Sequence, residues 1–396
     1  MQMNRSLAAR MGVMAAALAI GVLGALALAA PARAATLTQV SSFGSNPGNL
    51  TMYSYRPDGL PGGSPAVVLL HGCTQNADTY FTNSGWRKYA DQWGFALIVA
   101  EQKSANNSNS CFNWFQAGDT ARGQGEALSI RSMVSYGVST YGLDSSRIYL
   151  SGLSAGGAMS AVMLATYPDV FAAGSIIAGI PYRCATSLGG AFGCMNPGVD
   201  KTPAQWGDLV RGAYPGYGGR YPRVAIWHGS SDTTVVPRNA TESVEQWTDV
   251  RGVSQTPTST RDLGFNTTLK VYGGDVVRLY QISGMGHGTP VRPGSGTDQC
   301  GTAAAYFLNT ICAAYHEAVF FGLSGGTPPP SPTPSPTTSD PVCVTSSNYA
   351  HTTAGRAYQS GGYTYANGSH QYMGLWNTYT TTTLKQTGPN YWVIGC

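Results

Sequence analysis

IYLSGLSAGGAMS, at residues 148–160, is the stretch that decides the fold of this chain. Its first residues have the apolar character of a buried strand, and its last residues are typical of a buried helix. Between them lies Gly152-Leu153-Ser154-Ala155-Gly156, a G-x-S-x-G sequence at a strand-to-helix turn. Such a turn needs glycines, because its backbone is strained and passes close to neighbouring elements. The stretch therefore predicts an elbow that exposes the Ser154 hydroxyl.

A second match to the same pattern shows that the five-residue pattern alone does not identify a catalytic serine. Gly322-Leu323-Ser324-Gly325-Gly326 also reads G-x-S-x-G, but TPPPSP follows it. Proline lacks a backbone donor and cannot continue a helix, so no elbow helix can begin after Ser324. Glycine makes up 51 of the 396 residues, so chance matches are expected, and only Ser154 has the required context.

Short apolar runs recur on both sides of the elbow, bounded by turn residues. They are unbroken rather than alternating, which is typical of strands buried on both faces of a sheet. Strand and helix repeated in this way predict the α/β class, with a mostly parallel sheet covered by helices on both faces. The expected strands are 65–70, 95–100, 147–151, 174–178, 223–228 and 276–282, and the clearest helical patterns are 125–141 and 157–167.

Residues 1–34 have the pattern of a secretory signal peptide. Arg5 and Arg10 precede a long apolar run, and Ala32-Arg33-Ala34 provides a small-residue cleavage site. No later apolar span occurs, so we expect export without a membrane anchor in the mature chain. Removing the three Arg of the leader lowers the net charge from +4 to +1, which argues against a nucleic-acid partner. Charged residues are only 11% of the chain, which suits a neutral substrate.

Eight cysteines in an exported chain imply disulfide bonds. One pair brackets the C-terminal tail, two further pairs are close in sequence, and one pair remains. The expected bonds are Cys343–Cys396, Cys184–Cys194, Cys300–Cys312 and Cys73–Cys111. The sequence has no C-x-x-C and no His/Cys cluster with zinc spacing, so we expect no metal.

A nucleophilic serine needs a base, and the base needs an orienting acid. His287 stands in the glycine-flanked loop ISGMGHGTP just after the last expected strand, where a flexible turn can present its imidazole. Asp232 lies in WHGSSDTTV, in the loop directly after the strand RVAIWH, unlike the other Asp residues of this region. The order Ser154, Asp232, His287 is the order expected of an α/β-hydrolase.

Two backbone N–H groups must stabilise the oxyanion that such a serine creates. One is expected from Ala155, the residue immediately after the nucleophile. The other should come from a loop after an early strand, and VVLLHGCTQ provides this loop with Cys73 as the donor. Without this role, His71-Gly72 would simply mark a tight turn.

A family resemblance that covers about residues 36–320 is carried by seven motifs: LLHGCTQNADTY, CFNWF, GLSAGGAMS, YPDVFAAGSIIAGIPYRCA, IWHGSSDTTVVPRN, VEQWTDVRGV and GMGHGTPV. Together they resemble the secreted poly(3-hydroxybutyrate) depolymerase family of esterases, to which feruloyl and acetylxylan esterases are closely related. The resemblance implies the triad Ser154, Asp232 and His287 and the oxyanion donors Cys73 and Ala155. It also implies cofactor-free hydrolysis of the polyester, through an acyl-enzyme, to 3-hydroxybutyrate and short oligomers.

SGGTPPPSPTPSPTTSDP, at residues 324–341, is a Pro/Ser/Thr-rich linker that cannot form a packed core. Beyond it, the tail contains seven Tyr and two Trp but no acidic residue. Its segments NYAH…AGRA and ANGS…MGL resemble the C-terminal substrate-binding domain of extracellular polyhydroxyalkanoate depolymerases. The expected organisation is a signal peptide (1–34), an α/β-hydrolase catalytic domain (35–323), the linker (324–341) and a small, disulfide-closed, β-rich substrate-binding domain (342–396).

The expected partner is an insoluble polyester surface, bound by a secreted, extracellular and monomeric protein. Trp is usually a core residue, but the candidates for substrate contact are Trp86, Trp114 and Trp247 in the catalytic domain and Tyr372 and Trp376 in the tail. Two alternatives remain. A feruloyl or acetylxylan esterase would share the triad and could also use a binding tail. A catalytically silent polymer-binding protein would not need the intact triad.

Overall fold

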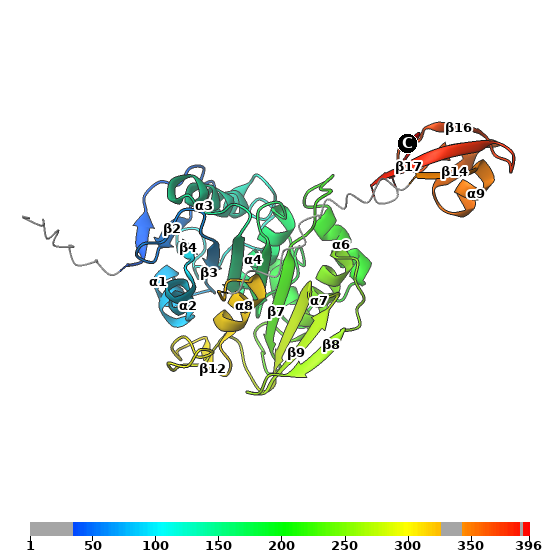
Figure 1. Cartoon of the computed structure of the whole chain (residues 1–396). Helices are drawn as coiled ribbons and strands as arrows, with labels where there is room; N and C mark the ends of the chain where they lie inside the picture. Colours follow the sequence, from blue (N-terminus) through cyan, green and yellow to red (C-terminus); the bar gives the residue numbers. More distant parts are fainter. Residues whose placement is uncertain (1–34, 326–342, 389–390) are drawn as a thin grey trace, which may run out of the picture.

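The computed structural model describes residues 35–325, 343–388 and 391–396 (Figure 1). The expected signal peptide and residues 326–341 of the expected linker lie outside these ranges. Within the described ranges, no helix is both long and apolar enough to cross a membrane. The part before the linker and the tail are described separately below.

A ten-stranded sheet forms the centre of the first part, in the order β1-β2-β4-β3-β5-β6-β7-β10-β9-β8 (Figure 1). The six strands from β4 to β10 are parallel, and two antiparallel strands flank them at each edge. The strands are β1 Thr38–Val40, β2 Thr51–Tyr55, β3 Ala66–Leu70, β4 Ala96–Glu101, β5 Ile148–Leu153, β6 Ala173–Ile177, β7 Arg223–Gly229, β8 Ser259–Asp262, β9 Thr267–Tyr272 and β10 Val277–Ile282. The predicted mostly parallel sheet is confirmed, and the six predicted strands are its six parallel members.

Helices cover both faces of this sheet, because the central strands are apolar on both sides. Val68 and Leu70 of β3 belong to one hydrophobic cluster, and Val67 and Leu69 belong to the other. The first face is covered by α3 Gly125–Tyr141, α4 Ala155–Thr166, α5 Leu188–Met195, α6 Pro203–Arg211 and α7 Arg238–Val250. The second face is covered by α1 Ala77–Asn83, α2 Trp86–Trp93 and α8 Ala313–Phe321, with the short pair β11 Thr289–Val291 and β12 Phe307–Asn309 beside them.

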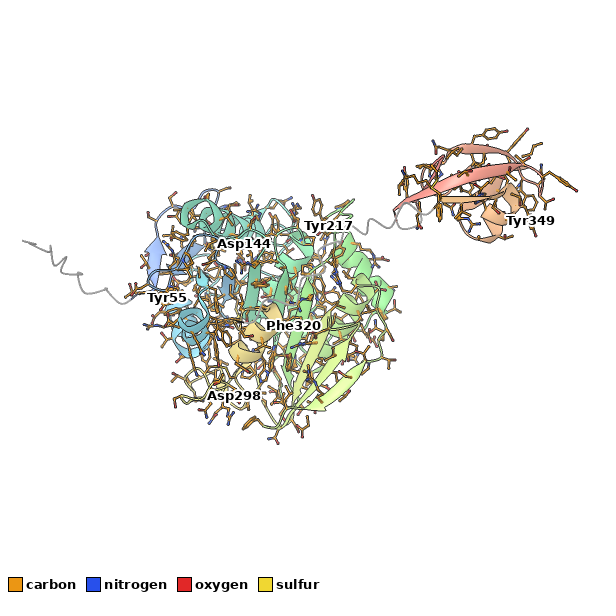
Figure 2. The ribbon with its side chains drawn as sticks, viewed as in Figure 1. Tyr55, Asp144, Tyr217, Asp298, Phe320 and Tyr349 are labelled. Atoms are coloured by element: carbon orange, nitrogen blue, oxygen red, sulfur yellow. A yellow bond between two sulfur atoms is a disulfide. The ribbon has the colours of Figure 1, made fainter. Side chains whose placement is uncertain are left out.

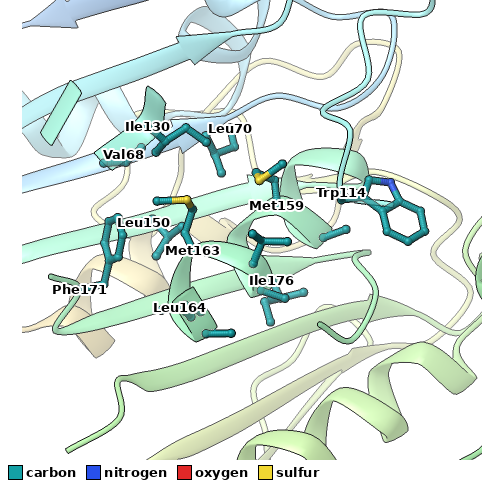
Figure 3. Close-up of a cluster of buried hydrophobic side chains, with 14 of the residues drawn as sticks. Val68, Leu70, Trp114, Ile130, Leu150, Met159, Met163, Leu164, Phe171 and Ile176 are labelled. Carbon is teal, nitrogen blue, oxygen red and sulfur yellow. The ribbon is translucent and has the colours of Figure 1, made fainter. Parts of the chain in front are cut away.

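Helix α4 is the central helix of the first face, and all of its side chains are buried. Figure 3 shows part of the cluster, with Met159 and Met163 of α4 near Leu150 of β5. A helix that is apolar all round must be enclosed by other elements. The residue before α4 is therefore held against a rigid core.

The tail has its own small core, built between two three-stranded antiparallel sheets and one helix. Ala357, Ala366, Met373, Leu384 and Trp392 form this core. The sheets have the orders β13-β17-β18 and β14-β15-β16, and the bounds are β13 Cys343–Ser347, α9 Asn348–Thr353, β14 Ala357–Ser360, β15 Tyr363–Ala366, β16 Tyr372–Leu375, β17 Thr381–Gly388 and β18 Tyr391–Ile394. The predicted β-rich tail is confirmed, and Figure 2 shows its side chains, Tyr349 among them.

Four disulfide bonds staple the chain, and all eight cysteines take part in them. They join Cys73 to Cys111, Cys184 to Cys194, Cys300 to Cys312 and Cys343 to Cys396. The last bond closes the tail from its first strand to its end. Such bonds stabilise a fold mainly by constraining the unfolded chain, and a core as small as that of the tail needs this help.

A carboxyl group is buried beneath the sheet. Glu317 of α8 is fully buried, and its Oε1 accepts a hydrogen bond of 2.8 Å from the Ser175 hydroxyl of β6. Its other oxygen has no partner among the described residues. Burial therefore raises the pKa of Glu317 from its ordinary value of 4.5 to about 7.

Glu317→Gln should remove a pH-dependent loss of stability. Because the folded-state pKa lies above the unfolded value, the contribution of the protonated carboxyl is fully present below about pH 4.5 and is lost as the pH rises through 7. We expect the free energy of unfolding of the wild type to fall relative to the variant by about 3 kcal/mol between pH 4 and pH 8. Denaturant unfolding at a series of pH values measures this difference.

Asp298→Asn provides the control. Asp298 is half exposed in a surface ion pair with Arg292, which contributes little to stability (Figure 2). Its pH–stability curve should follow the wild type. Parallel curves for the wild type and Glu317→Gln would show that the buried carboxyl does not titrate in this range.

Candidate active site

Ser154 lies at the sharp turn between β5 and α4. Its backbone has φ 57° and ψ −117°, and a positive φ is strained for a residue with a side chain. Its N–H donates a hydrogen bond of 2.9 Å to the carbonyl oxygen of Ile177, at the end of the neighbouring strand β6. The fold thus holds the hydroxyl group above the carboxyl edge of the sheet.

The turn leaves no room for side chains on either side of Ser154. A Cβ atom added to Gly152 would lie 2.3 Å from the carbonyl oxygen of Gly156. One added to Gly156 would lie 2.2 Å from the carbonyl oxygen of Leu70 in β3. Only glycine fits at both positions, which is the physical reason for the glycines of the G-x-S-x-G sequence.

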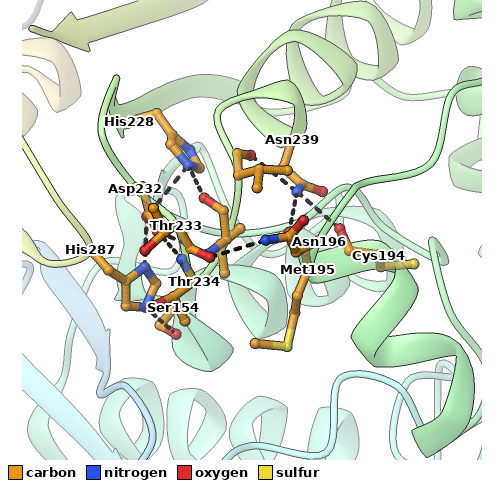
Figure 4. Close-up of polar contacts among 12 residues, drawn as sticks. Ser154, Cys194, Met195, Asn196, His228, Asp232, Thr233, Thr234, Asn239 and His287 are labelled. Carbon is orange, nitrogen blue, oxygen red and sulfur yellow. Dashed lines mark hydrogen bonds and ion pairs between the residues drawn. The ribbon is translucent and has the colours of Figure 1, made fainter.

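The three residues expected to form a triad lie in one hydrogen-bonded chain (Figure 4). His287 Nε2 is 2.8 Å from Ser154 Oγ, and His287 Nδ1 is 2.7 Å from Asp232 Oδ2. The side chain of Asp232 is inaccessible to solvent, and that of His287 is 9% exposed. The imidazole can therefore accept the serine proton at one nitrogen while a buried carboxylate holds the other.

The loops that carry Asp232 and His287 are bound to each other. Asp232 Oδ1 accepts two hydrogen bonds of 2.9 Å from the backbone N–H groups of Thr234 and Val235. The N–H of Ser231 donates to the carbonyl oxygen of Met285, 3.0 Å away in the loop of His287. The acid and the base are thus held by the same short stretch of backbone contacts.

The expected oxyanion donors lie on the adjacent strand ends. Ala155 N–H is at the first turn of α4, where the partial positive charge of the helix favours an anion. Cys73 follows β3 and is linked to Cys111 by a disulfide bond. Among the described hydrogen bonds, neither the N–H of Cys73 nor that of Ala155 has an acceptor. Both groups are therefore available to a substrate oxygen.

His71 fixes the loop of Cys73 and is not a second base. Its Nε2 accepts the N–H of Gln102 at 3.1 Å, so its Nδ1 carries the proton and donates to the carbonyl oxygen of Gly72 at 2.7 Å. Burial lowers the pKa of His71 to about 4, so its ring is neutral at ordinary pH. The residue ties the turn after β3 to the end of β4.

A cavity of about 360 Å³ lies between two loops at the same edge of the sheet. One loop follows β4 and contributes Asn107, Asn113 and Phe115. The other follows β6 and contributes Thr186, and Leu188 at the start of α5 lies beside it. In the sheet, β4 and β6 flank β3 and β5, whose ends carry Cys73 and Ser154. No charged side chain lines the cavity, so it suits a neutral ligand.

The three Trp residues of the catalytic part that were expected to contact substrate are buried. Trp86 and Trp247 are at most 1% exposed, and Trp114 is 6% exposed with its ring against Phe115. Each belongs to a hydrophobic cluster, so the expectation that they contact polymer is wrong. Their large apolar rings fill the core instead. The sequence patterns around them did not distinguish an enclosed ring from an accessible one.

Tyr306 is a residue at the site that the sequence analysis missed. Its ring meets the imidazole of His287 edge to face at 6.3 Å, and it is 45% exposed. Nothing local signals this position, because residue 306 reaches the site through the parallel pairing of β12 with β11, which follows His287. Among the described residues, no group of three or more His, Cys, Asp or Glu could hold a metal ion.

In the tail, Tyr372 is 57% exposed and Trp376 is 41% exposed. Tyr372 lies on the outer face of β16, whereas Trp376 lies beyond that strand. Trp376 donates a hydrogen bond to the Thr352 hydroxyl at 2.9 Å and contacts the ring of Tyr349. Both are accessible, but only Tyr372 lies beside other rings on a sheet, those of Tyr365 and Tyr358 on the adjacent strands.

Comparisons with known proteins identify esterases and a depolymerase as relatives of this chain. A family model described as Esterase PHB depolymerase matches residues 51–267, which include Ser154 and Asp232. Poly(3-hydroxyalkanoate) depolymerase C of Paucimonas lemoignei is 54% identical over 294 residues, covering 73% of this chain and 70% of that protein. Feruloyl esterase B of Talaromyces stipitatus is 39% identical over 265 residues, covering 65% of this chain and 73% of that protein.

A solved structure also resembles the catalytic part. Acetyl xylan esterase from Aspergillus awamori has a TM-score of 0.60 at 33% sequence identity. The match covers 64% of this chain and 94% of that chain. The predicted α/β-hydrolase architecture is thus also that of a solved esterase.

Ser154 should react selectively with a fluorophosphonate probe, which forms a covalent bond with an activated serine. Ser154→Ala should abolish labelling, because the variant lacks the activated hydroxyl with which the probe reacts. Asp232→Asn should slow labelling by up to about 10⁴-fold, since the imidazole loses its orienting carboxylate. Mass spectrometry of the labelled protein identifies the modified residue and gives the rate.

Ser324→Ala is the matched control, because Ser324 has the same five-residue pattern but follows α8 rather than entering a helix. Its labelling should equal that of the wild type. Probe found on Ser324, or retained by Ser154→Ala, would contradict the assignment of the elbow.

Proposed function

Because this chain belongs to the Esterase PHB depolymerase family, we propose that it is a secreted serine esterase that hydrolyses poly(3-hydroxybutyrate) outside the cell. The observation that carries the proposal is the hydrogen-bonded chain from Ser154 through His287 to the buried Asp232. The relative from Paucimonas lemoignei that is 54% identical acts, by its name, on poly(3-hydroxyalkanoate). The signal-like leader and the four disulfide bonds support an extracellular location.

The proposed reaction proceeds through an acyl-enzyme. Ser154 attacks an ester carbonyl of the polymer while His287 removes its proton, and Asp232 holds the imidazole in the productive tautomer. The N–H groups of Cys73 and Ala155 stabilise the tetrahedral oxyanion. His287 then protonates the departing hydroxyl of the chain, and water releases 3-hydroxybutyrate or a short oligomer. No cofactor is needed for this chemistry.

The cavity between the loops after β4 and β6 is the proposed site for polymer next to the reacting ester. A polyester chain is neutral, carries hydrogen-bond acceptors along its length and has apolar methyl groups. The cavity offers the hydroxyl of Thr186, the apolar surface of Leu188 and no charge. Its volume of about 360 Å³ is at the lower end of the usual range for ligand sites.

The floor of this cavity is pre-organised by a buried network. Asn107 Nδ2 donates to Asn113 Oδ1 at 3.1 Å, and Asn113 Nδ2 and N–H both donate to Glu126 of α3. Glu126 is 1% exposed, so its two bonds with Asn113 are shielded from water. A floor that is already rigid loses little entropy when a chain binds.

The tail is the proposed anchor on the solid polymer. Tyr358, Tyr365 and Tyr372 stand opposite one another on the adjacent strands β14, β15 and β16, and we call them the tyrosine row. Ring centroids along the row are 5.5 and 5.7 Å apart. The alternate residues Thr364 and Met373 face the core, so the rings lie on the outer face of the sheet.

The tyrosine row suits an uncharged, flat surface. The tail contains no acidic residue, and its only Lys and Arg are Lys385 and Arg356. Rings presented side by side on a sheet offer apolar area with hydroxyl tips that can donate to ester carbonyls. Because this surface and the active site belong to one chain, adsorption of the tail would raise the local concentration of ester bonds around Ser154.

A feruloyl or acetylxylan esterase is the second candidate. Relatives with those names are 35–39% identical or match in structure, and they would use the same triad. The higher identity to a polyhydroxyalkanoate depolymerase and the tyrosine-rich tail without acidic residues favour the polyester.

The full-length protein should release 3-hydroxybutyrate from suspended poly(3-hydroxybutyrate) granules but little ferulate or acetate from substituted arabinoxylan. Ser154→Ala should lower release by about 10⁴-fold or more, because the covalent step is lost. Chromatography of the soluble products measures all three compounds.

Release of ferulate or acetate with intact granules would show that the triad is right and the substrate is a polysaccharide. Release of hydroxybutyrate by Ser154→Ala would contradict the proposed mechanism itself.

The double substitution Tyr358→Ser and Tyr372→Ser should weaken adsorption to granules by about tenfold or more, since each exposed ring of an interface can contribute 1 kcal/mol or more. Hydrolysis of the soluble ester p-nitrophenyl butyrate should not change, because these residues lie in the tail. Depletion of protein from solution by increasing amounts of granules gives the affinity.

Tyr379→Ser is the matched control, since Tyr379 is 91% exposed but lies outside the tyrosine row. It should adsorb like the wild type. An equal loss in Tyr379→Ser would mean that any exposed ring contributes and that the row has no special role.

A further inference from the structure

A second histidine lies against the acid of the triad. His228 is the sixth residue of β7, four residues before Asp232, and it is 3% exposed. Its Nε2 is 2.7 Å from the carbonyl oxygen of Val235 and 3.6 Å from Asp232 Oδ2 (Figure 4). The ring is too deeply buried to touch a substrate, so any contribution to the reaction must act through Asp232.

The contact with Val235 fixes the tautomer of His228. A carbonyl oxygen only accepts hydrogen bonds, so Nε2 must carry the proton. Burial lowers the pKa of His228, which keeps the ring neutral beside the carboxylate. A neutral ring leaves the charge of Asp232 for His287, whereas a second imidazolium would compete for it.

Val235 connects the two side chains. Its N–H donates to Asp232 Oδ1 at 2.9 Å, and its carbonyl oxygen accepts the proton of His228. In the loop from β7 to α7, Val235 is therefore held by Asp232 at its N–H and by His228 at its carbonyl oxygen. His228 Nε2 also lies 3.6 Å from Oδ2, the oxygen that faces His287.

We propose that His228 is a positioning residue that holds Asp232 in the orientation required by His287, through the N–H of its Nε2 on the carbonyl of Val235. The role holds only if Ser154, His287 and Asp232 carry out the reaction, so it rests on the proposed function. A histidine that merely filled space in the core would need only its volume, not a donor at this position.

Two amide substitutions separate these roles. In His228→Gln the amide nitrogen lies near the position of Nε2 and can still donate to Val235, whereas in His228→Asn the side chain is one methylene shorter and cannot reach. We expect kcat for p-nitrophenyl butyrate to fall by about 10²-fold in His228→Asn, as for a small displacement of a catalytic group, with KM nearly unchanged. His228→Gln should recover most of the loss.

The rates should be expressed per active site, counted with a fluorophosphonate probe, so that unfolded protein does not enter kcat. His228→Leu adds a variant with bulk but no donor, and it should resemble His228→Asn. Equal activity of the Gln and Asn variants, or a change in KM alone, would overturn the positioning role.

Ser154→Ala, assayed in parallel, separates the two levels of the proposal. If it is inactive while His228→Asn and His228→Leu keep full kcat, only the role of His228 is lost. If Ser154→Ala remains active, the triad itself is wrong and the role of His228 falls with it.

Discussion

The close contact between the first turn of α4 and the end of β3 is the constraint on which the rest of the site depends. Gly156 approaches the carbonyl oxygen of Leu70 so closely that a single added carbon would collide with it. This contact places Ala155 beside the loop that begins at His71. One backbone approach therefore constrains the relative positions of Ser154 and the loop of Cys73, which carry the proposed nucleophile and one of the proposed oxyanion donors.

The remaining parts of the site are fixed in the same manner, by backbone groups and buried neutral rings. His71 holds the turn before Cys73, and His228 holds the carbonyl of Val235 behind Asp232. Both rings are buried, and burial lowers the pKa of each. Of these three histidines at the strand ends, His287 is the one hydrogen-bonded to Ser154, which makes it the proposed base.

Much of the fold could be read from the sequence because its strongest signals are local. The six parallel strands are continuous apolar runs, and the elbow is a short pattern at a strand-to-helix boundary, so both are visible without tertiary knowledge. The edge strand β8 was not predicted, because its four residues STRD are all exposed and carry no apolar pattern. It forms through pairing with β9, which only the folded chain provides.

The candidate site was predictable to the same extent. Ser154, Asp232 and His287 follow strand ends, and parallel strands bring such ends to one edge of the sheet. Trp86 and Trp247 were misjudged because the burial of an aromatic ring depends on what packs over it. The tyrosine row depends on the register between three strands, and Tyr306 depends on a pairing between distant segments. Neither is encoded in spacing along the chain.

The tyrosine row also has a consequence for the solutions in which the tail can bind its substrate. Adhesion through uncharged rings contains no ionic component for dissolved salt to screen. Adsorption through the tyrosine row should therefore depend little on the concentration of dissolved salt.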